Sequence, residues 1–494
     1  MDENRVEGVQ IAFMSGALKD DDIRLRGVVG REALSRLFEF DLVFSRKDGP
    51  YTRAELEKVL RTPCAMTMGP RPGDVVHGIL SSIEIVDSAK NAEPRYLARM
   101  VPTVWLLTLS RSNRVFQATT IPKMVETILV QYGLAKGHDF QILTSRPNPE
   151  HEYLVQYEET DWDFIQRWLE HEGMYYWFEH GGTTDKLIIS DTNHDATPID
   201  DPAAISYRER NNLTNLRDST VWDWAPRLKR TPARVAVYEY NYRTPALPLA
   251  EKFEVDLVKG FGGMFFYGEH FRTPEEGQAV ATLRAERLLC EHLTVSGRTD
   301  CARFRVGHTF QLENHFDAEN DAEYLITTLE HRVGFPLLAN GALGESVERY
   351  SATFVAIPYT VAFRPERVTP WPSIHGVIHA HVEGDTAGEY AEIDEQGRYK
   401  IKLPFDSGEI RGLKASQWIR MAQSYSGAGY GHHFPLHKGT EVLLVHIDGD
   451  PDRPVIVGSV PNPQSLSPTT TRNATQSVIQ TASGLRLEME DLQK

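Results

Sequence analysis

The alternation of apolar and polar positions is clearest between Tyr390 and Pro463. In the first strand of this stretch the apolar residues Tyr399, Ile401, Leu403 and Phe405 alternate with the basic residues Arg398, Lys400 and Lys402, the period of a half-buried strand. A second apolar strand, Val442 to Ile447, turns through 448–454 into a third, Val455 to Val460. Short strands joined by Gly, Asp and Pro turns, with no helical stretch between them, predict a small closed β-barrel.

The first 115 residues follow the same period. The predicted strands are Ile23–Gly30, Phe38–Phe44, Val76–Leu80 and Tyr96–Leu107. One short helix is predicted from about Thr52 to Leu60. We interpret residues 1–115 as a β-barrel.

Residues 116–200 change to a helical period. Proline at the second position of Ile121-Pro122 favours a helix start, and this helix ends at Gly133. A second helix is predicted from Thr160 to Gly173, followed by the strands Met174–Phe178 and Lys186–Ser190. The aromatic residues of this α/β region are Trp162, Trp168, Tyr175, Tyr176 and Trp177. They could stack on a carbohydrate, but aromatic residues on a strand beside a helix are more often core.

Strand patterns return over residues 201–363. The predicted strands are Val235–Tyr240, Glu254–Val258, Phe304–Leu312, Tyr324–Val333 and Arg349–Pro358. One helix interrupts them. Thr273 is suited to cap the start of this helix, and Pro274 is suited to its first turn. Glu275 and Glu276 favour the positive end of the helix dipole.

A stiff connector with Pro365, Pro370 and Pro372 leads into the C-terminal barrel. A polar Ser/Pro/Thr linker follows that barrel, and strand alternation then resumes. The apolar candidates in this last segment are Val478, Ile479, Leu485, Leu487 and Met489, with Leu485, Leu487 and Met489 set against Arg486, Glu488 and Glu490. Such a strand cannot bury one face by itself, so these five residues are the candidates for whatever contact covers it.

Composition limits the class of protein. A chain of 494 residues is long enough for roughly three or four domains, and its 41% hydrophobic and 25% charged residues are ordinary for a soluble globular protein. A net charge of −16 argues against general affinity for nucleic acid or anionic lipid.

Cys64, Cys290 and Cys301 are too scattered for a disulfide framework or a zinc site, so we expect reduced thiols. The N-terminus shows no secretory signal, and no run approaches the ~20 apolar residues of a membrane helix.

Candidate chemistry is weak along the whole chain. The loop Gly427-x-Gly429-x-Gly431 resembles a phosphate cradle but is not followed by a helix, so a tight loop between strands is favoured. The three histidines His432, His433 and His437 have no Cys or clustered Asp to complete a metal set. The Asp448, Asp450 and Asp452 pattern is better explained by a turn than by a calcium loop. No nucleophile motif is present. We therefore expect no catalytic, cofactor-binding or metal-binding residues and no enzyme.

Three segments carry a specific resemblance. "GRYKIKLPFD", "WIRMAQSYSGAGYG" and "HKGTEVLLVHIDGDPDRPVIVGSVPNP" resemble the oligonucleotide/oligosaccharide-binding (OB) barrel of the VgrG family, the spike proteins of type VI secretion systems, which are similar to the fused hub and spike of contractile phage tails. "YLVQYEETDWDFIQRWLEHEGMYYWFEH" resembles the α/β insertion of that family, and "CARFRVGHTFQLENH" with "EYNYRTP" resembles its second hub barrel. Tyr240-Asn241-Tyr242 stands where the family has YDF, a mild departure.

The resemblance implies a mainly β fold with five parts. They are a first hub β-barrel (1–115), an α/β insertion (116–200), a second hub β-barrel (201–363), the OB barrel with its Pro-rich connector (364–463), and a linker with the start of a trimeric β-helical needle (464–494). It also implies a non-enzymatic homotrimer that caps the hexameric Hcp tube, carries a PAAR-repeat tip, contacts baseplate proteins and effectors or their adaptors, and punctures a target membrane. Such a protein is cytoplasmic before firing and is exported by the contractile apparatus without a signal peptide.

Two other interpretations stay open. Some relatives carry a C-terminal toxin and phage relatives carry a lysozyme, but the roughly 30 residues after the OB barrel are fewer than the ~50 that a catalytic domain usually needs. Whether the chain is truncated or naturally short is open, as are the needle length, the cargo and the parent apparatus. The other alternative is an OB-type binder of single-stranded nucleic acid or glycan. It would use Arg398, Lys400 and Lys402, although fold alone does not carry function.

Overall fold

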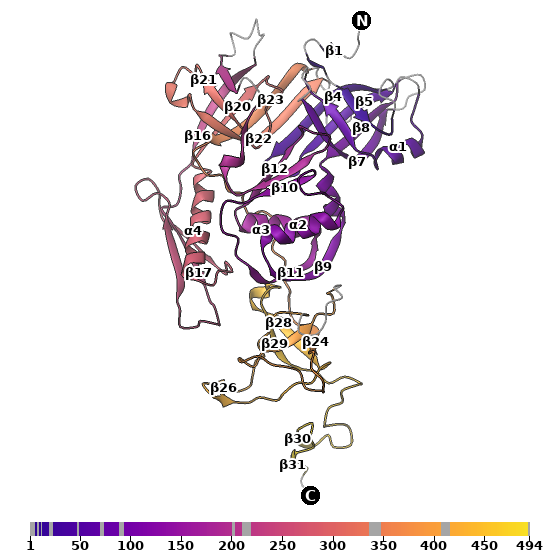
Figure 1. The fold of residues 1–494 in the computed structure, drawn as a ribbon, viewed down its shortest axis with the longest axis vertical. Helices are drawn as coiled ribbons and strands as arrows, with labels where there is room; N and C mark the ends of the chain where they lie inside the picture. Colours follow the sequence, from indigo (N-terminus) through magenta and orange to yellow (C-terminus); the bar gives the residue numbers. More distant parts are fainter. Residues whose placement is uncertain are drawn as a thin grey trace. The chain divides into compact units, whose positions relative to one another are not determined.

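The computed structural model describes residues 5–6, 9–10, 12–18, 23–46, 49–69, 74–87, 93–199, 203–209, 219–334, 347–406 and 415–492 (Figure 1). The chain forms two compact units. The first comprises Met1–Leu109, Val125–Asn148 and Trp162–Pro370, and the second Ser110–Met124, Pro149–Asp161 and Trp371–Lys494. The mainly β fold with an α/β insertion is confirmed, while the limits of the five parts remain a prediction.

The N-terminal barrel of the first unit has six strands in the order β4-β5-β8-β7-β6-β3. They are β3 (Ala12–Ser15), β4 (Ile23–Ala33), β5 (Glu39–Arg46), β6 (Cys64–Thr67), β7 (Val75–Asp87) and β8 (Arg95–Val101). A two-stranded ladder of β1 (Arg5–Val6) and β2 (Val9–Gln10) precedes them. Helix α1 (Arg53–Val59) confirms the predicted helix, and Thr52 and Glu55 form a capping box at its start.

One strand prediction in this barrel was too long. The predicted strand Tyr96–Leu107 ends at Val101 in the structure and continues as the 3₁₀ helix η2 (Thr103–Leu109). Pro102 ends the ladder because it has no N–H to donate, and its carbonyl accepts the first 3₁₀ hydrogen bond from Trp105 at 2.9 Å.

The second barrel is closed. Its strands are β15 (Ala204–Tyr207), β16 (Thr220–Leu228), β20 (Leu293–Thr299), β21 (His308–Glu313), β22 (Glu323–Gly334) and β23 (Val347–Pro358), with β14 (Thr197–Pro198) added beside β21. Pairing of β21 with both β15 and β22 completes the ring of six strands. The predicted strand Phe304–Leu312 begins later than expected, at His308.

The two barrels share one continuous sheet because β22 pairs antiparallel with β4, from Thr328 opposite Ala33 to Gly334 opposite Gly27. A buried polar chain lies at this junction. His331 Nε2 donates to Glu32 Oε1 at 2.9 Å, and the Tyr350 hydroxyl donates to His331 Nδ1 at 2.6 Å. Burial raises the pKa of Glu32, but the hydrogen bond and charge of His331 and the charge of Arg305 outweigh it and lower that pKa to about 2. Burial lowers the pKa of His331, so the pair is held as carboxylate and neutral imidazole.

The α/β insertion contains α2 (Ile121–Gln131), α3 (Asp161–His171) and the three-stranded sheet β10-β13-β12, formed by β10 (Phe140–Leu143), β13 (Lys186–Ser190) and β12 (Tyr175–Glu179). Both predicted helices and both predicted strands are confirmed. All five aromatic side chains considered for sugar stacking, from Trp162 to Trp177, are at most 2% exposed. The core interpretation is therefore confirmed.

A second three-stranded sheet, β18-β17-β19, packs one face against α4 (Pro274–Leu289). Thr273 caps α4 by accepting from the Glu276 N–H, as the sequence predicts. The strands are β17 (Arg234–Glu239), β18 (Leu249–Glu254) and β19 (Gly263–Tyr267). The predicted strand Glu254–Val258 was wrong. The Asp256 carboxylate accepts from the N–H groups of Val258 and Lys259 and turns the chain there instead.

The OB barrel belongs to the second unit. Its sheet has the order β25-β24-β28-β29, formed by β24 (Ile378–Glu383), β25 (Lys400–Lys402), β28 (Glu441–His446) and β29 (Pro454–Ser459). Bridges from Ile419 to Tyr399 and from Met421 to Ile456 close it. The predicted closed barrel is confirmed, with a first strand shorter than expected.

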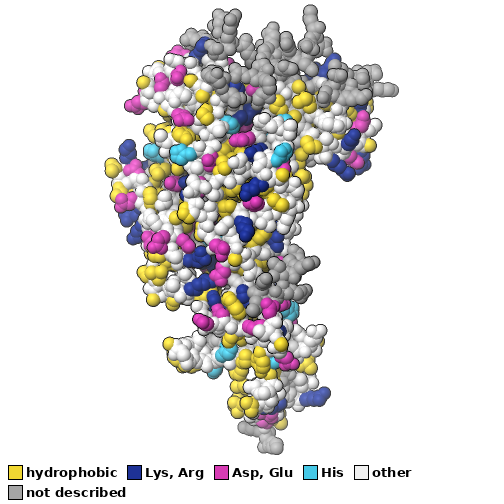
Figure 2. Space-filling view, in the orientation of Figure 1, with side chains coloured by type: hydrophobic (Ala, Val, Ile, Leu, Met, Phe, Trp, Pro, Cys, Tyr) yellow, Lys and Arg dark blue, Asp and Glu magenta, His cyan; other side chains and the backbone are white. Residues whose placement is uncertain are grey.

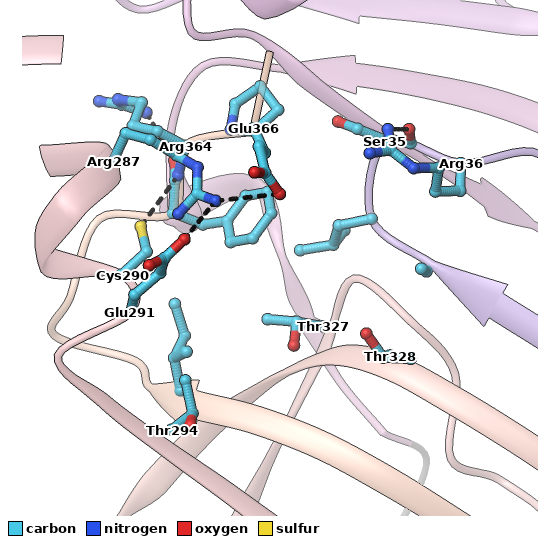
Figure 3. Close-up of a pocket in the computed structure, with 15 residues that line it drawn as sticks. Ser35, Arg36, Arg287, Cys290, Glu291, Thr294, Thr327, Thr328, Arg364 and Glu366 are labelled. Atoms are coloured by element: carbon cyan, nitrogen blue, oxygen red, sulfur yellow. Dashed lines mark hydrogen bonds and ion pairs between the residues drawn. The ribbon is translucent and has the colours of Figure 1, made fainter. Parts of the chain in front are cut away.

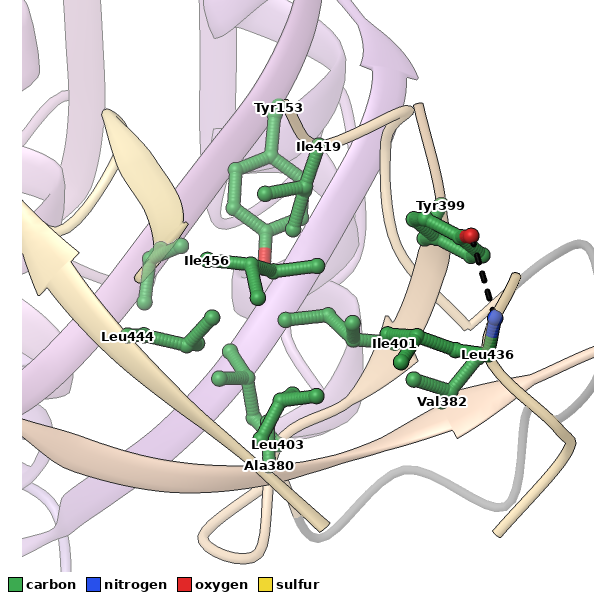
Figure 4. Close-up of a cluster of buried hydrophobic side chains, with 12 residues drawn as sticks. Tyr153, Ala380, Val382, Tyr399, Ile401, Leu403, Ile419, Leu436, Leu444 and Ile456 are labelled. Atoms are coloured by element: carbon green, nitrogen blue, oxygen red, sulfur yellow. Dashed lines mark hydrogen bonds between the residues drawn. The ribbon is translucent and has the colours of Figure 1, made fainter. Parts of the chain in front are cut away.

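The core of this barrel draws on two distant parts of the chain (Figure 4). Tyr399, Ile401, Val442 and Leu444 come from the barrel itself and are buried. The antiparallel pair β9 (Arg111–Thr119) and β11 (His151–Thr160) adds Tyr153 and Val155 to the same core. The Val155 N–H also donates to Asp452 Oδ1 at 2.5 Å.

Two small hairpins complete the second unit. One is β26 (Ser426–Gly427) with β27 (Tyr430–Gly431), and the other is β30 (Gln476–Gln480) with β31 (Arg486–Glu490). The remaining short helical turns are η3 (Asn193–Asp195), η5 (Ala318–Asn320) and η7 (Ile447–Gly449). Of the helices in the described ranges, none is long and apolar enough to cross a membrane.

Candidate interaction surface

The hairpin β30–β31 contains every residue that the sequence predicts at an interface. Its register pairs Gln476 with Glu490, Ile479 with Leu487, and Gln480 with Arg486. The connecting segment is closed by a hydrogen bond of 2.9 Å from the Thr481 N–H to the Leu485 carbonyl. The strand alternation predicted at the C-terminal end is therefore confirmed.

The register divides the hairpin into an apolar and a polar face. Directly paired residues share a face, as do residues two positions apart. Ile479, Leu487 and Met489 therefore lie on one face, and Leu485 continues the same alternation along its strand. The opposite face carries Gln476, Val478, Gln480, Arg486, Glu488 and Glu490. Four of the five predicted interface residues thus share a face, while Val478 does not.

The apolar face is open to solvent in the single chain. Ile479 is 48% exposed, Leu485 74%, Leu487 57% and Met489 54%. On the polar face Arg486 bonds to Glu488 at 2.8 Å and donates to Gln480 at 3.2 Å, so that face is internally paired. A two-stranded hairpin with no covered face is marginal by itself in water. The four apolar side chains hereafter form the hairpin face, a surface suited to be covered by another polypeptide.

The glycine loop is a hairpin turn. β26 and β27 flank Ala428 and Gly429, which confirms the interpretation as a tight loop between strands. The three histidines nearby have separate partners. His432 Nδ1 is 2.7 Å from Ser424 Oγ, the His433 ring stacks on Tyr399, and His437 lies 3.7 Å from Glu389. In the described part of the chain no group of three or more His, Cys, Asp or Glu side chains is placed to hold a metal ion.

The aspartate run forms a turn, as predicted. Asp448 adopts φ 56° within η7, and Asp450 accepts from the Asp452 N–H at 3.0 Å. Asp452 is buried and bonds to Val155 of β11, so this residue ties the β9–β11 pair to the barrel.

The three basic residues considered for nucleic-acid binding are engaged within the barrel. Arg398 forms an ion pair with Asp394, and Lys402 Nζ donates to Asp406 at 2.8 Å. Lys400 is buried, donates to the Ser416 carbonyl and lies 4.9 Å from the Trp418 ring centroid. Burial also lowers the pKa of Lys400. Basic and acidic side chains are intermingled on the face shown in Figure 2. These contacts argue against an electrostatic groove for a phosphate backbone.

A cavity of about 290 Å³ lies beside the end of α4 (Figure 3). Its arginines are paired: Arg287 contacts Glu291 at 2.6 Å, and Arg364 contacts Glu286 at 2.8 Å. Cys290 donates to the Ala362 carbonyl, and burial raises the pKa of its thiol to about 11. A protonated thiol held by backbone groups is a poor nucleophile.

The three cysteines are unbonded and buried. Burial raises the pKa of Cys64 to about 12. Reduced thiols remain the expectation for these three residues.

Comparison with known protein families defines the class. The family model described as the phage tail baseplate hub (GPD) matches residues 31–336, and the model described as the type VI secretion system/phage-baseplate injector OB domain matches residues 390–460. The chain belongs to the phage tail baseplate hub family. The predicted likeness to the VgrG family is confirmed as well.

Individual relatives agree with this class. The chain is 29% identical to the type VI secretion system spike protein VgrG1a of Pseudomonas aeruginosa, covering 93% of this chain and 71% of that protein. It is 29% identical to VgrG1c of the same organism over 95% of this chain and 64% of that protein. The actin cross-linking toxin VgrG1 of Vibrio cholerae is 26% identical, over 94% of this chain and 43% of that protein. This chain thus spans less than two thirds of the length of the second and third of these relatives.

Solved structures share the fold. An Escherichia coli component of the type VI secretion system, described as structurally similar to the T4 bacteriophage tail proteins gp27 and gp5, superposes with a TM-score of 0.65 at 23% identity, covering 91% of this chain and 99% of that one. A chain of the Francisella PdpA-VgrG complex gives a TM-score of 0.60 at 9% identity, covering 98% of this chain and 83% of that one.

Proposed function

We propose that this chain is one third of the spike of a type VI secretion system, a trimer that caps the Hcp tube and punctures a target membrane to deliver effectors. The observation that carries the proposal is the hairpin face, which is apolar, solvent-exposed and located where the VgrG resemblance implies three-chain winding. When three hairpins come together, each covers apolar side chains of the others that a single hairpin leaves exposed to water.

The two barrels support the tube contact. Three chains with two barrels each supply six barrels, which suits a hexameric ring of tube subunits. The continuous ladder between β4 and β22 keeps each pair of barrels at a fixed spacing, as a rigid ring requires. A PAAR-repeat tip, baseplate proteins, and effectors or their adaptors are the further partners of such a spike. We also propose that it is made in the cytoplasm and exported by the contractile apparatus.

The proposed role is mechanical and not enzymatic. Within the described residues, the cavity beside α4 holds paired arginines and a protonated thiol instead of an activated nucleophile. The toxin among the relatives is more than twice as long as the part that this chain matches, so an enzyme domain on a longer version of the protein is the second candidate. Sequencing the gene past the codon for Lys494 tests that candidate.

Light scattering on the purified chain tests the spike. We expect a particle of three times the 55.9 kDa chain mass that binds purified Hcp. Deleting Thr475–Lys494 removes the hairpin face and should shift the particle toward single chains. A stable monomer of the intact chain that ignores Hcp would overturn the proposal, whereas a trimer unchanged by the deletion would show that the barrels alone hold it.

A further inference from the structure

The OB unit has a second exposed surface besides the hairpin face, formed by the segment between Ala422 and Leu436. Between Ala422 and Leu436 the chain leaves the barrel wall, forms the β26–β27 hairpin and returns. Both ends are anchored, because the Ala422 N–H donates to the Ile456 carbonyl at 2.7 Å and the Leu436 N–H donates to the Tyr399 hydroxyl at 3.2 Å. Residues 424–435 between these anchors are all exposed. We call residues 424–435 the arm.

The arm presents aromatic side chains to solvent. Tyr425 is 59% exposed, Tyr430 60% and Phe434 52%, and the Tyr425 and Tyr430 rings lie 5.4 Å apart. Exposed aromatic residues gathered on one projection mark contact sites more often than random surface.

The arm also has a defined shape. Tyr430 lies directly over Gly427, where a Cβ would come within 2.2 Å of the ring, and Gly429 turns the chain at φ 77°. The His432 N–H donates to the Tyr425 carbonyl at 2.9 Å. These contacts hold the two tyrosines in place before any partner arrives, which lowers the entropy lost on binding.

The arm lacks acidic, lysine and arginine side chains. From Met421 to His437 there is no Asp, Glu, Lys or Arg, in a chain where 25% of residues are charged. Nucleic acid and acidic or basic proteins would call for complementary charge, which this segment lacks. At a rotation axis, by contrast, each residue faces its own copies, so a charge of either sign meets the same charge and is repelled.

We propose that the arms of three chains meet one another around the threefold axis of the spike, with Tyr425, Tyr430 and Phe434 packed between copies. The occupant of this surface is therefore a second and a third copy of this chain. The inference rests on the proposed trimer and adds to it a contact independent of the hairpin face. The hairpin obeys the same rule, since its uncharged face is the one left open while its charged face is internally paired.

Like-charge substitution with rescue tests the inference in the full-length chain. Ala428 is exposed at the turn of the arm, so Ala428→Glu and Ala428→Lys leave the barrel core untouched. Each variant alone should raise the concentration for half-assembly, followed by light scattering, at least about tenfold. Mixing the two variants should recover part of the assembly, because two of the three arm contacts in a mixed trimer then join unlike charges. Ser459→Glu, on an exposed position of β29, is the matched control and should assemble normally.

The outcomes separate the two proposals. A wild-type chain that stays monomeric overturns both the spike and the arm contact. A wild-type trimer whose assembly is unchanged by Ala428→Glu and Ala428→Lys keeps the spike and overturns the arm contact. Weakening without rescue in the mixture also overturns it, because the arms then touch something other than themselves. Oxidative cross-linking of Ala428→Cys into two-chain products is expected only when the arms meet, since the native cysteines are buried.

Discussion

The OB barrel and the β30–β31 hairpin belong to one unit and carry the same alternation of apolar and polar residues, yet their burial is opposite. In the barrel, Tyr399 and Ile401 are fully buried, because bridges join the edges of the sheet and Tyr153 and Val155 of β11 pack into the same core. In the hairpin, Leu485 and Leu487 are 74% and 57% exposed. The alternation of residues along a strand therefore determines which side chains share a face. Whether that face is buried depends on which other segments or chains pack against it.

The largest expected effect comes from charging the hairpin face. Leu487→Glu should convert the proposed trimer to single chains, because three carboxylates would be brought together in an apolar contact. Light scattering gives the mass, and circular dichroism should show that the chain stays folded. Val478→Glu lies on the opposite face and is the matched control. Equal loss of assembly in both variants would contradict the division of the hairpin into two faces.

Inside the barrel, the expected effect is on stability instead of assembly. Ile401→Ala should lower the free energy of unfolding of the OB unit by ~2–5 kcal/mol, since it leaves a cavity among closely packed side chains. Val457→Ala, at a position that is 41% exposed, should change it by less than ~0.5 kcal/mol. Denaturant titration followed by tryptophan fluorescence measures both. A small effect of Ile401→Ala would mean that the barrel core is looser than its burial indicates.

The hydrogen bond between β11 and the barrel should contribute less to the free energy of unfolding. Asp452→Ala removes the carboxylate that accepts from the Val155 N–H, a charge-assisted bond whose loss costs about 1.5–3 kcal/mol. Hydrogen exchange at the Val155 amide should speed up in this variant. Asp448→Asn, exposed and able to keep φ 56°, serves as the control. Unchanged exchange at Val155 would show that packing of Tyr153 alone holds the pair.

The smallest expected effect is on pH dependence. Burial lowers the pKa of His180 to about 3, so the unfolded chain binds the proton first and stability falls as the pH drops from about 6.5 toward 3. His180→Gln should reduce the loss of stability between pH 7 and 5.5 by about 1 kcal/mol. Thermal melts across this range measure it, with the exposed His138→Gln as control. Parallel curves for wild type and His180→Gln would exclude a contribution from this group.

Local signals in the sequence were sufficient where neighbours along the chain decide the structure. Thr273 caps α4 as predicted, the helix predicted from about Thr52 forms with that residue as its cap, and the glycine loop is a turn between strands. The Asp256 turn was missed although an Asx-turn is also a local signal. The split between Val478 and Ile479 could likewise have been found, because adjacent strand residues face opposite sides.

Other features depend on contacts between distant residues and could not be read locally. The participation of Tyr153 and Val155 in the OB core joins positions about 300 residues apart, as the bond from Val155 to Asp452 does. The engagement of Lys400 with Ser416 and Trp418 required the barrel to close first. The exposed arm could not be predicted either, because only the exposed fractions of its tyrosine side chains in the structure show that they are uncovered.

The ladder from β4 to β22 also has a mechanical consequence. A linker between two barrels would let them swing, and a thrust on one would be dissipated in bending before it reached the other. Here the joint is a ladder of backbone hydrogen bonds between strands about 4.8 Å apart, the same kind of pairing that forms the wall of each barrel. A force applied to one barrel is therefore passed to its neighbour through paired strands instead of through a linker.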